Sequence, residues 1–330
     1  RSTLFPYTTL FRSPYSTAQR REQNVQDVPL AISAFSEAEM ERRQITEALD
    51  LVRVVPNLVG HNNTGPGSSN VYFLRGLGNT SSVTTFDPPV GTYVDDVYIS
   101  RQSANNYALF DVERIEVLRG PQGTLFGRNT TGGAVNVITK KPSQDFATFV
   151  EVGTGRFDRF MGRASMDLPV SDQVLTKFSG FYQEHDGFVR STVTAEKNNG
   201  LKSYGGRVAV RLLPTDAITW DIAGEYTSDS QLNLIRNLNA PSTNNTGFTQ
   251  RSGAGSLLDQ ARRGEGLGSE TDTLFFVSNF GIELDHATLS FITGYREETW
   301  EHIIDFLPSG VRGRSAIWRS EERRVGKECR

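Results

Sequence analysis

Apolar and polar residues alternate with a period of two through most of the chain after residue 146, which is the pattern of β-strands with two different faces. Within 202–213, Tyr204 and Val208 fall on one face, and Arg207 and Arg211 fall on the other. Seven segments show the alternation, near 146–154, 158–168, 173–183, 202–213, 216–227, 272–283 and 287–297. Strands of this length cross a bilayer when they are tilted, so the pattern predicts antiparallel transmembrane β-strands.

The links between these segments are alternately short and long. Residues 169–172, 213–216 and 284–287 are short links, whereas 184–201 and 228–271 are long and rich in Asn, Ser and Gly. An outer-membrane β-barrel has short periplasmic turns and longer external loops. A soluble β-sandwich also alternates polar and apolar residues, but we do not expect it to sort its loops in this way.

The cost of placing charge in lipid decides which face of the predicted strands points outward. An arginine that faces lipid at mid-membrane costs roughly 2–4 kcal/mol, so Arg207 and Arg211 are expected to face the barrel lumen. Tyr204, Trp220 and Tyr226 are then expected to face outward, where aromatic residues form interfacial girdles.

The N-terminal part of the chain mixes short strands with a helix, which predicts a compact α+β domain. Strands are expected at 28–35 and 71–75, and a hairpin at 90–100 that turns at Asp95-Asp96. An acidic pair can belong to a metal site, but aspartate suits tight hairpin turns and no third ligand lies nearby, so we expect a turn.

A helix is expected between the first two of these strands. Ser36 and Glu39 form a capping-box pattern at its start. Apolar residues at helical spacing continue through 45–52 and stop before Pro56, which predicts one helix over this stretch.

A glycine-rich stretch, FDVERIEVLRGPQGTLFGRNTTGGAVNVIT, follows at 110–139, with strands expected at 115–118 and 134–138. Its glycines are Gly120, Gly123, Gly127, Gly132 and Gly133. Such density indicates turns with positive φ or places where two backbones approach closely. The spacing fits no phosphate-binding motif.

The run LRGPQGTLFGRNTTGGAVNVITKKP strongly resembles the end of the plug domain of TonB-dependent outer-membrane receptors. The resemblance extends upstream through TAQRREQNVQDVPLAISAFS, the RGLG at 75–78, and the hairpin VGTYVDDVYISR. It covers 17–142 closely, and the remainder more loosely as the start of the barrel. Four ordered blocks are specific for the family and say little about the substrate.

The resemblance implies an α+β plug domain followed by antiparallel transmembrane β-barrel strands, the beginning of a barrel of roughly 22 strands. It implies ligand-gated uptake of a scarce solute across the bacterial outer membrane, without a cofactor. The partners would be TonB with its inner-membrane energising complex, outer-membrane lipid, and a small solute. A ferric siderophore is the commonest solute in the family, and cobalamin, haem, nickel and carbohydrate are alternatives.

The resemblance also suggests site residues. The outward apices of the plug would be the loops at 77–89 and 99–109. The candidates for ligand contact are Phe86, Arg101, Gln102, Asn105 and Tyr107, each of which can also be read as ordinary loop surface. Arg75 and Arg119 resemble plug arginines that pair with barrel glutamates, which would lie beyond this chain.

The segment that contacts TonB would lie near Ser16, Thr17 and Ala18. In the family an extended TonB box at this place adds a strand to TonB. Here the preceding residues read Pro14-Tyr15-Ser16 and lack the usual aliphatic run, so an incomplete box is expected.

The two ends of the chain resemble translated sequencing adapter, and codons exist that make their DNA reverse-complementary. We therefore expect residues 1–13 and 319–330 to be non-native tails. The expected domains are a TonB-box-proximal linker at 14–27, a plug at 28–142, and a partial barrel at 146–318.

Removing the tails changes the composition that bears on partners. Each tail carries a charge of +2, so the formal charge of −3 becomes −7, which disfavours nucleic acid as a partner. The only cysteine, Cys329, lies in a tail.

Enzymatic chemistry finds no support in the motifs. The histidines His61, His185, His286 and His302 form no HExxH and no Cys/His metal spacing, and no G-x-S-x-G occurs. We therefore expect no catalytic residues, no metal site and no enzyme. A passive adhesin or porin-like barrel is the other alternative, which the plug-like blocks argue against.

Overall fold

The computed structural model describes residues 15–16, 23–24, 30–62, 69–79, 87–100, 105, 109–190, 197–232, 268–305 and 312–329. The chain divides into two compact units, with the main boundary between Lys140 and Lys141. The first unit contains the residues up to Asn62 and Asn70–Lys140, and the second contains Lys141 onward together with Asn63–Ser69. The predicted domain limits at 28–142 and 146–318 remain predictions.

The first unit is built on a five-stranded sheet with the order β3-β9-β10-β7-β8. Its strands are β3 (Ala31–Ser36), β7 (Val90–Val94), β8 (Val97–Ile99), β9 (Val112–Arg119) and β10 (Gly133–Thr139). All neighbours are antiparallel except β10 and β7, which are parallel. The sheet confirms the strands predicted at 28–35, 115–118 and 134–138 and the hairpin at 90–100, and β3 forms one of its two edges.

Smaller elements complete this unit. They are β1 (Tyr15–Ser16) paired with β2 (Gln23–Asn24), the helices α1 (Glu37–Arg43) and α2 (Gly123–Phe126), the 3-10 helix η1 (Ala48–Arg53), and a three-stranded sheet of β4 (Leu58–Asn62), β5 (Asn70–Leu74) and β6 (Leu77–Gly78).

The core of the first unit follows from the central strands. Alternate residues of β9 and β10, Ile115, Val117, Val135 and Val137, are completely buried, as is typical of β-branched residues in a covered sheet. On the opposite face, a cluster formed by Ile32, Ala34, Tyr93, Tyr98, Leu118, Phe126 and Ala134 is buried. Both faces of the sheet are therefore covered, which explains the continuous apolar runs in these strands.

The single helix expected from Ser36 to Pro56 is wrong. Helix α1 ends at Gln44, which adopts the left-handed conformation with φ 53°, and the chain resumes as η1. Ser36 is the N-cap of α1 but makes no side-chain cap hydrogen bond, and the carboxylate of Glu39 bonds Arg42 and Arg43 instead. The helical spacing of apolar residues could not show that α1 ends at Gln44, because a single left-handed residue leaves this spacing nearly unchanged.

The Asp95-Asp96 turn is confirmed, since both residues have positive φ values of 46° and 67°. The carboxylate of Asp95 accepts hydrogen bonds from the backbone N–H and the hydroxyl of Thr139, at 3.0 and 2.7 Å. The hairpin side chain is therefore bonded to the end of the neighbouring strand β10.

The glycine-rich stretch also behaves as expected at two positions. Gly133 has φ 148°, and a Cβ placed there would lie 2.2 Å from the carbonyl oxygen of Leu118, so no other residue fits without movement. Gly120 has φ 108° and ends the strand after Arg119. These are the close approach and the positive φ that the glycine density predicts.

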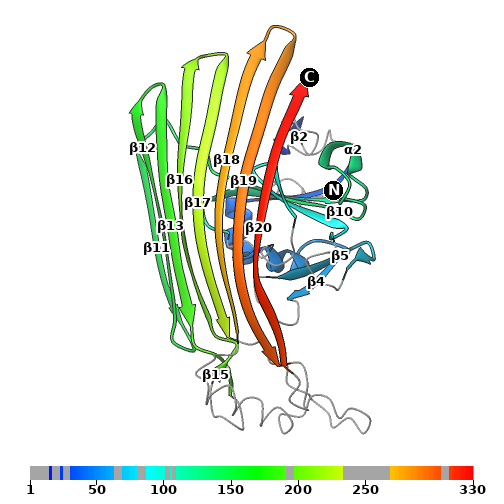
Figure 1. Cartoon of the computed structure of the whole chain (residues 1–330). Coiled ribbons are helices and arrows are strands. Elements are labelled where there is room, and N and C mark those ends of the chain that lie inside the picture. The colour runs from blue at the N-terminus through cyan, green and yellow to red at the C-terminus, as the bar shows by residue number, and fades with distance from the viewer. Residues whose placement is uncertain are drawn as a thin grey trace, which may run out of the picture. The chain divides into compact units, whose positions relative to one another are not determined.

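The second unit is an eight-stranded antiparallel sheet in chain order, coloured green to red in Figure 1. Its strands are β11 (Ala147–Gly155), β12 (Arg159–Ser171), β13 (Val174–His185), β16 (Leu201–Thr215), β17 (Ile218–Leu232), β18 (Gly268–Leu284), β19 (Ala287–Asp305) and β20 (Arg312–Cys329). The short pair β14 (Val189–Arg190) and β15 (Lys197–Asn198) lies in the link between β13 and β16.

The strands are longer than the alternation predicted, and the turns at one end are correspondingly tighter. They occupy only 172–173, 216–217 and 285–286, whereas the links at the other end include 186–200 and 233–267. The expected four-residue turns were too long because residues such as Pro169 and Leu213 still pair with the neighbouring strand or bond its end. The asymmetry between the two ends is confirmed.

The two faces of this sheet are sorted as predicted. The register places Arg207 beside Glu225 and Arg211 beside Asp221, while Tyr204, Trp220 and Tyr226 lie on the opposite face, each between 38% and 43% exposed. The cross-strand ion pairs on the charged face include Arg163–Glu151, Lys177–Asp167 at 2.7 Å, Arg207–Glu225 at 3.1 Å, and Arg211–Asp221, with two contacts of 2.7 and 2.9 Å.

An eighth strand, β20, was not expected from the alternation. It pairs with β19 and runs through 319–329, the stretch assigned to a non-native tail. Strand pairing does not test where these residues come from, so that assignment remains a prediction. Among the residues that the structure describes, no helix is long and apolar enough to cross a membrane.

Candidate functional site

Arg75 and Arg119 lie at the ends of two strands of the first unit. Arg75 follows β5 in a tight turn with Gly76, with φ values of 54° and 82°, and its backbone N–H donates to the carbonyl of Asn57 at 3.0 Å. Arg119 is the last residue of β9, and its register partners are Ala31 of β3 and Gly133 of β10. Both backbones are therefore fixed, one by a turn and the other by a strand on each side.

The side chain of Arg75 reaches the end of β9. Its Nη1 atom lies 3.1 Å from the position that a Cβ would take at Gly120, the residue after Arg119. The absence of a side chain at Gly120 makes this approach possible. The fold thus brings together the two arginines that the sequence singled out from separate motifs.

The pair carries two positive charges without an anion in the described part of the chain. Arg75 is exposed, and the Nε atom of Arg119 is buried without a hydrogen-bond partner. Neither arginine forms an ion pair with any described residue. Arg119 is half-buried, and a buried charged donor without a hydrogen-bond partner is costly.

Most of the predicted ligand-contact residues cannot be placed. Phe86, Arg101, Gln102 and Tyr107 lie outside the described residues, as do Thr17 and Ala18 of the predicted TonB-contact segment. Ser16 belongs to β1, where it pairs with Gln23.

Asn105 is described, and its side chain is 3% exposed. Its Oδ1 accepts from the backbone N–H of Asn70 at 2.6 Å, and its Nδ2 donates to the Asn70 carbonyl at 2.8 Å. The side chain of Asn70 in turn donates to the Tyr72 hydroxyl at 3.0 Å. In this structure Asn105 ties its segment to the start of β5, and its contact with a ligand remains a prediction.

Sequence reasoning missed a buried ion pair on β9. Arg114 Nε lies 3.0 Å from the carboxylate of Glu116, which is completely buried, and Arg114 also pairs with Glu113. Arg114 and Glu116 are two residues apart and so lie on the same face of the strand, which was the available signal. A second ion pair, between Lys140 and Glu37 of α1, joins residues 103 positions apart and had no sequence signal.

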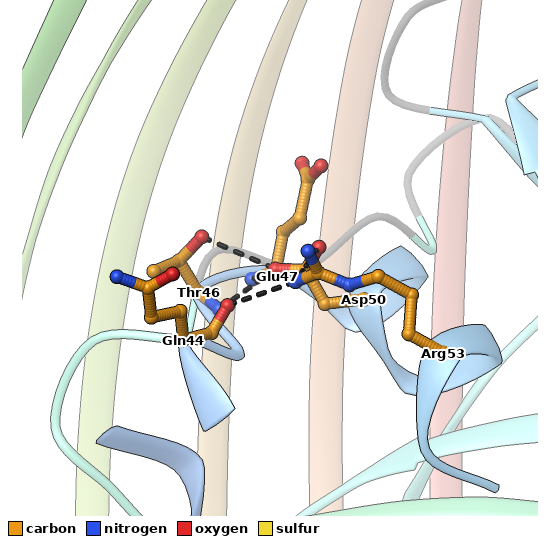
Figure 2. A network of polar contacts seen from close by, with 5 residues as sticks. All are labelled: Gln44, Thr46, Glu47, Asp50 and Arg53. Carbon is orange, nitrogen blue, oxygen red and sulfur yellow. Dashed lines mark hydrogen bonds and ion pairs between the residues drawn. The ribbon is translucent and has the colours of Figure 1, made fainter. Parts of the chain in front are cut away.

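A polar network around Asp50 was also missed (Figure 2). The carboxylate of Asp50 accepts from the N–H groups of Thr46 and Glu47 at 2.8 and 3.2 Å and pairs with Arg53 at 2.8 Å. Arg53 also donates to the carbonyl of Gln44 at 2.9 Å. Glu47 and Asp50 form a capping box at the start of η1, and their spacing of three residues was the signal that could have revealed it.

The first unit matches a known domain family. Residues 24–134 match the TonB-dependent receptor plug domain. The matched range contains both arginines and the strands from β3 to β9.

Curated relatives agree with this match. The pesticin receptor of Yersinia pestis is 32% identical over 187 residues, which cover 56% of this chain and 27% of that protein. The vitamin B12 transporter BtuB of Vibrio vulnificus (strain CMCP6) is 29% identical over 191 residues, which cover 57% of this chain and 30% of that protein. The aligned part of the chain thus spans less than a third of either relative.

Solved structures extend the likeness to the second unit. The ferric yersiniabactin uptake receptor FyuA from Yersinia pestis superposes with a TM-score of 0.70 at 20% identity, over 91% of this chain and 46% of that chain. The pyoverdine outer-membrane receptor FpvA from Pseudomonas aeruginosa PAO1 gives a TM-score of 0.69 at 16% identity, over 90% of this chain and 42% of that chain. At these identities the likeness shows the fold alone. In this chain the fold is an α+β plug followed by antiparallel strands, and the strands that the structure describes do not close a barrel. This chain therefore contains a match to the TonB-dependent receptor plug domain at 24–134 and shares its fold with solved structures of outer-membrane receptors.

Proposed function

We propose that the protein to which this chain belongs is a bacterial outer-membrane transporter that takes up a scarce solute with energy delivered by TonB. The solute binds outside, the plug closes the lumen of a barrel of roughly 22 strands, and TonB pulls on the N-terminal segment to open it. No covalent bond is made or broken in this function.

The observation that carries the proposal is the order of the two units in one chain. A plug-domain match at 24–134 is followed by an antiparallel sheet with one charged and one aromatic face and with its long links at one end. A charged face suits a water-filled lumen, and an aromatic face suits lipid. We therefore assign residues 28–142 to the plug and 146–318 to the first part of the barrel wall.

The arginine pair gives the plug a means of attachment. Arg75 and Arg119 would bind carboxylates of barrel strands that lie beyond this chain. The exposed guanidinium of Arg75 and the buried, unpartnered Nε of Arg119 support this role, because both remain to be neutralised.

The remaining sites stay as proposals from the family resemblance. The solute would contact plug loops that carry Phe86, Arg101, Gln102, Asn105 and Tyr107. TonB would bind near Ser16, Thr17 and Ala18, within a linker at 14–27. Residues 1–13 and 319–330 would be non-native tails.

A ferric siderophore is the solute class that we propose. Among the similar structures, FyuA is a ferric yersiniabactin uptake receptor and FpvA is a pyoverdine receptor bound to pyoverdine. The relative BtuB is named a vitamin B12 transporter, so cobalamin is the main alternative, and haem and carbohydrate remain further ones.

Uptake by whole cells tests the proposal. The full-length parent would be expressed in an iron-limited host that lacks its own siderophore receptors, with and without TonB, and supplied with radioactive ferric siderophores or cobalamin. The proposal expects accumulation of at least one ferric siderophore only when TonB is present. Uptake that is equal without TonB would point to a passive barrel, and uptake of cobalamin alone would change the solute class.

A further inference from the structure

Strand β5 has different neighbours along its two edges. On one edge it pairs with β4 along its whole length, from Asn70 opposite Asn62 to Leu74 opposite Leu58. On the other edge, β6 pairs only with the last two residues, Phe73 and Leu74. In the part of the chain that the structure describes, the beginning of β5 therefore has a neighbouring strand on one edge only.

The side chain of Asn105 takes the place of a strand at the beginning of β5. Its Oδ1 accepts from the backbone N–H of Asn70 at 2.6 Å, and its Nδ2 donates to the carbonyl of the same residue at 2.8 Å. A carboxamide carries both an acceptor and a donor, as a peptide unit does, so it can pair with both backbone groups of one residue. The two residues are 35 positions apart, so this pairing joins β5 to a distant segment.

Both partners of this pairing are shielded from water. Asn105 is 3% exposed and Asn70 is completely buried. A buried backbone N–H or C=O that loses its partner is costly, because water no longer solvates it. Without the amide of Asn105, the first residue of β5 would have two such groups. We therefore expect the beginning of β5 to shift or open when this amide is removed.

The segment that carries Asn105 is attached to another part of the plug. Four residues after Asn105, the backbone N–H of Leu109 donates to the carbonyl of Thr46 at 3.1 Å. The N–H of Thr46 donates in turn to the carboxylate of Asp50 at 2.8 Å, within the network of Figure 2. Asn105 thus links β5 to a part of the plug that has its own polar network.

The other end of β5 meets the ends of β9 and β10. A Cβ on Gly133 would lie 2.5 Å from Cδ2 of Leu74, and Nη1 of Arg75 lies 3.1 Å from the Cβ position of Gly120. Gly133 is the register partner of Arg119, and Gly120 is the residue after it. Leu74 and Arg75 therefore lie against the two glycines that adjoin Arg119.

Strand β5 connects these two sets of contacts. Asn70 and Arg75 are five residues apart, about 16–17 Å along an extended strand. Between them, Val71 and Leu74 are completely buried. Because β4 pairs with every residue of β5, the strand moves as one body. A change of position at Asn70 is therefore passed on to Arg75.

We propose that Asn105 is a positioning residue for the arginine pair of the plug. Its amide sets the position of β5, and β5 sets where the guanidinium of Arg75 meets Gly120. The inference rests on the proposed function, in which Arg75 and Arg119 attach the plug to the barrel. In this role the side chain of Asn105 acts on the attachment of the plug and needs no contact with the solute.

Hydrogen exchange in the purified full-length receptor tests whether Asn105 acts at this distance. Asn105→Leu keeps a side chain of similar size and removes both hydrogen bonds to Asn70. The inference expects the amides of Asn70 and Arg75 to exchange several-fold faster than in the unsubstituted receptor. The Arg75 amide is the informative one, since its own partner is the carbonyl of Asn57 at 3.0 Å. The amide of Val117 in β9 should exchange at an unchanged rate, which would show that the plug is folded.

Tyr93→Phe is the matched control for a general loosening of the plug. It also removes a buried hydrogen bond, from the Tyr93 hydroxyl to the carbonyl of Phe126, but Tyr93 belongs to β7 of the five-stranded sheet. It should leave exchange at Arg75 unchanged. Equal acceleration at Arg75 in Tyr93→Phe and Asn105→Leu would overturn the inference. Acceleration at Asn70 alone in Asn105→Leu would also overturn it, because Asn105 would then hold only the beginning of β5.

Asn105→Ala is a second variant in case Asn105→Leu does not fold. The smaller side chain leaves room for water at the two freed backbone groups of Asn70, so it is the milder change. It should still accelerate exchange at Arg75, by a smaller factor. Exchange at Arg75 equal to that of the unsubstituted receptor would overturn the inference.

A double-mutant cycle in cells tests the link to the attachment of the plug. Asn105→Leu and Arg75→Ala should each raise the entry of a large glycopeptide antibiotic several-fold, at matched receptor levels. The double variant should admit no more antibiotic than Arg75→Ala alone. Effects of substitutions more than about 7–10 Å apart normally add, so the absence of a further effect would show that Asn105 acts through Arg75. Independent effects that combine in the double variant would overturn the inference.

Failure of the proposed function would give a different pattern. No TonB-dependent uptake by the unsubstituted receptor would overturn the proposed function, whatever the exchange at Arg75. Unchanged antibiotic entry in Arg75→Ala would overturn the attachment by the arginine pair, and this inference with it. Normal TonB-dependent uptake together with unchanged exchange at Arg75 in Asn105→Leu would overturn the inference alone.

Discussion

The guanidinium of Arg75 lies 3.1 Å from the place where Gly120 would carry a Cβ. This contact places the end of β5 beside the end of β9 and brings the guanidinium of Arg75 to Gly120, the residue that follows Arg119. Gly120 is therefore part of the arrangement of the arginine pair as well as a turn residue with φ 108°.

Gly120→Ala should destabilise the plug by about 1–3 kcal/mol, because alanine is strained at this φ and its Cβ displaces Arg75. Gly123→Ala is the matched control, since a Cβ there meets nothing within 4 Å and alanine favours the helix α2. Hydrogen exchange of the β9 amides in the full-length receptor measures both effects. Equal exchange in the two variants would contradict the close approach of Arg75.

Arg119→Ala should loosen the plug and raise the permeability of the outer membrane to large antibiotics. Removing one partner of a buried ion pair costs about 3–5 kcal/mol. Arg128→Ala serves as the control, because Arg128 is 87% exposed and its carboxylate partner Asp87 lies 3.6 Å away. Antibiotic sensitivity would be measured in bacteria with matched levels of the two receptors. If Arg119→Ala left the sensitivity unchanged, Arg119 would have no role in holding the plug in place.

The stability of the plug should fall at alkaline pH through Tyr72. Burial raises the pKa of the Tyr72 hydroxyl, while the hydrogen bond from Asn70 opposes the shift and the charges of Glu47 and Asp50 add to it. A tyrosine of the unfolded chain titrates near pH 10. The buried neutral hydroxyl therefore contributes its full stability below about pH 10, and this contribution is lost as pH rises further toward the raised pKa.

Tyr72→Phe should remove this pH dependence. At neutral pH the variant loses the Asn70–Tyr72 hydrogen bond, worth about 0.5–1.5 kcal/mol. Its disadvantage should shrink between about pH 10 and 12. Urea unfolding of the plug in both proteins at pH 8 and pH 11 measures the difference, and parallel losses of stability would show that Tyr72 does not titrate as described.

The sequence predicted which segments form strands better than it predicted where those strands begin and end. The alternation of polar and apolar residues predicted seven long strands of the second unit: β11, β12, β13, β16, β17, β18 and β19. A strand with one polar and one apolar face requires this alternation along its whole length. The alternation misplaced the ends of these strands, since Pro169 and Leu213 look like turn residues and yet pair with or bond the neighbouring strand. The end of helix α1 at Gln44 was not predicted either, because a single left-handed residue does not change the spacing of the apolar residues.

The candidate site was predictable in its members and not in its geometry. Arg75 and Arg119 were found by family resemblance, but their convergence depends on two backbones that meet only in the fold. The Lys140–Glu37 pair spans 103 positions and could not be inferred from spacing. Phe86, Arg101, Gln102 and Tyr107 lie outside the described residues, so their roles remain predictions.

The claim on which the rest depends is that the eight-stranded sheet crosses the outer membrane with its long links outside the cell. Arg156, in the turn between β11 and β12, lies at that end, and Asp216, between β16 and β17, lies at the other; both residues are exposed. Cysteines would be placed at each position in the full-length receptor and treated with a membrane-impermeant thiol reagent on intact cells. The account predicts labelling of Arg156→Cys and none of Asp216→Cys until the outer membrane is opened. Labelling of Asp216→Cys alone on intact cells would contradict it.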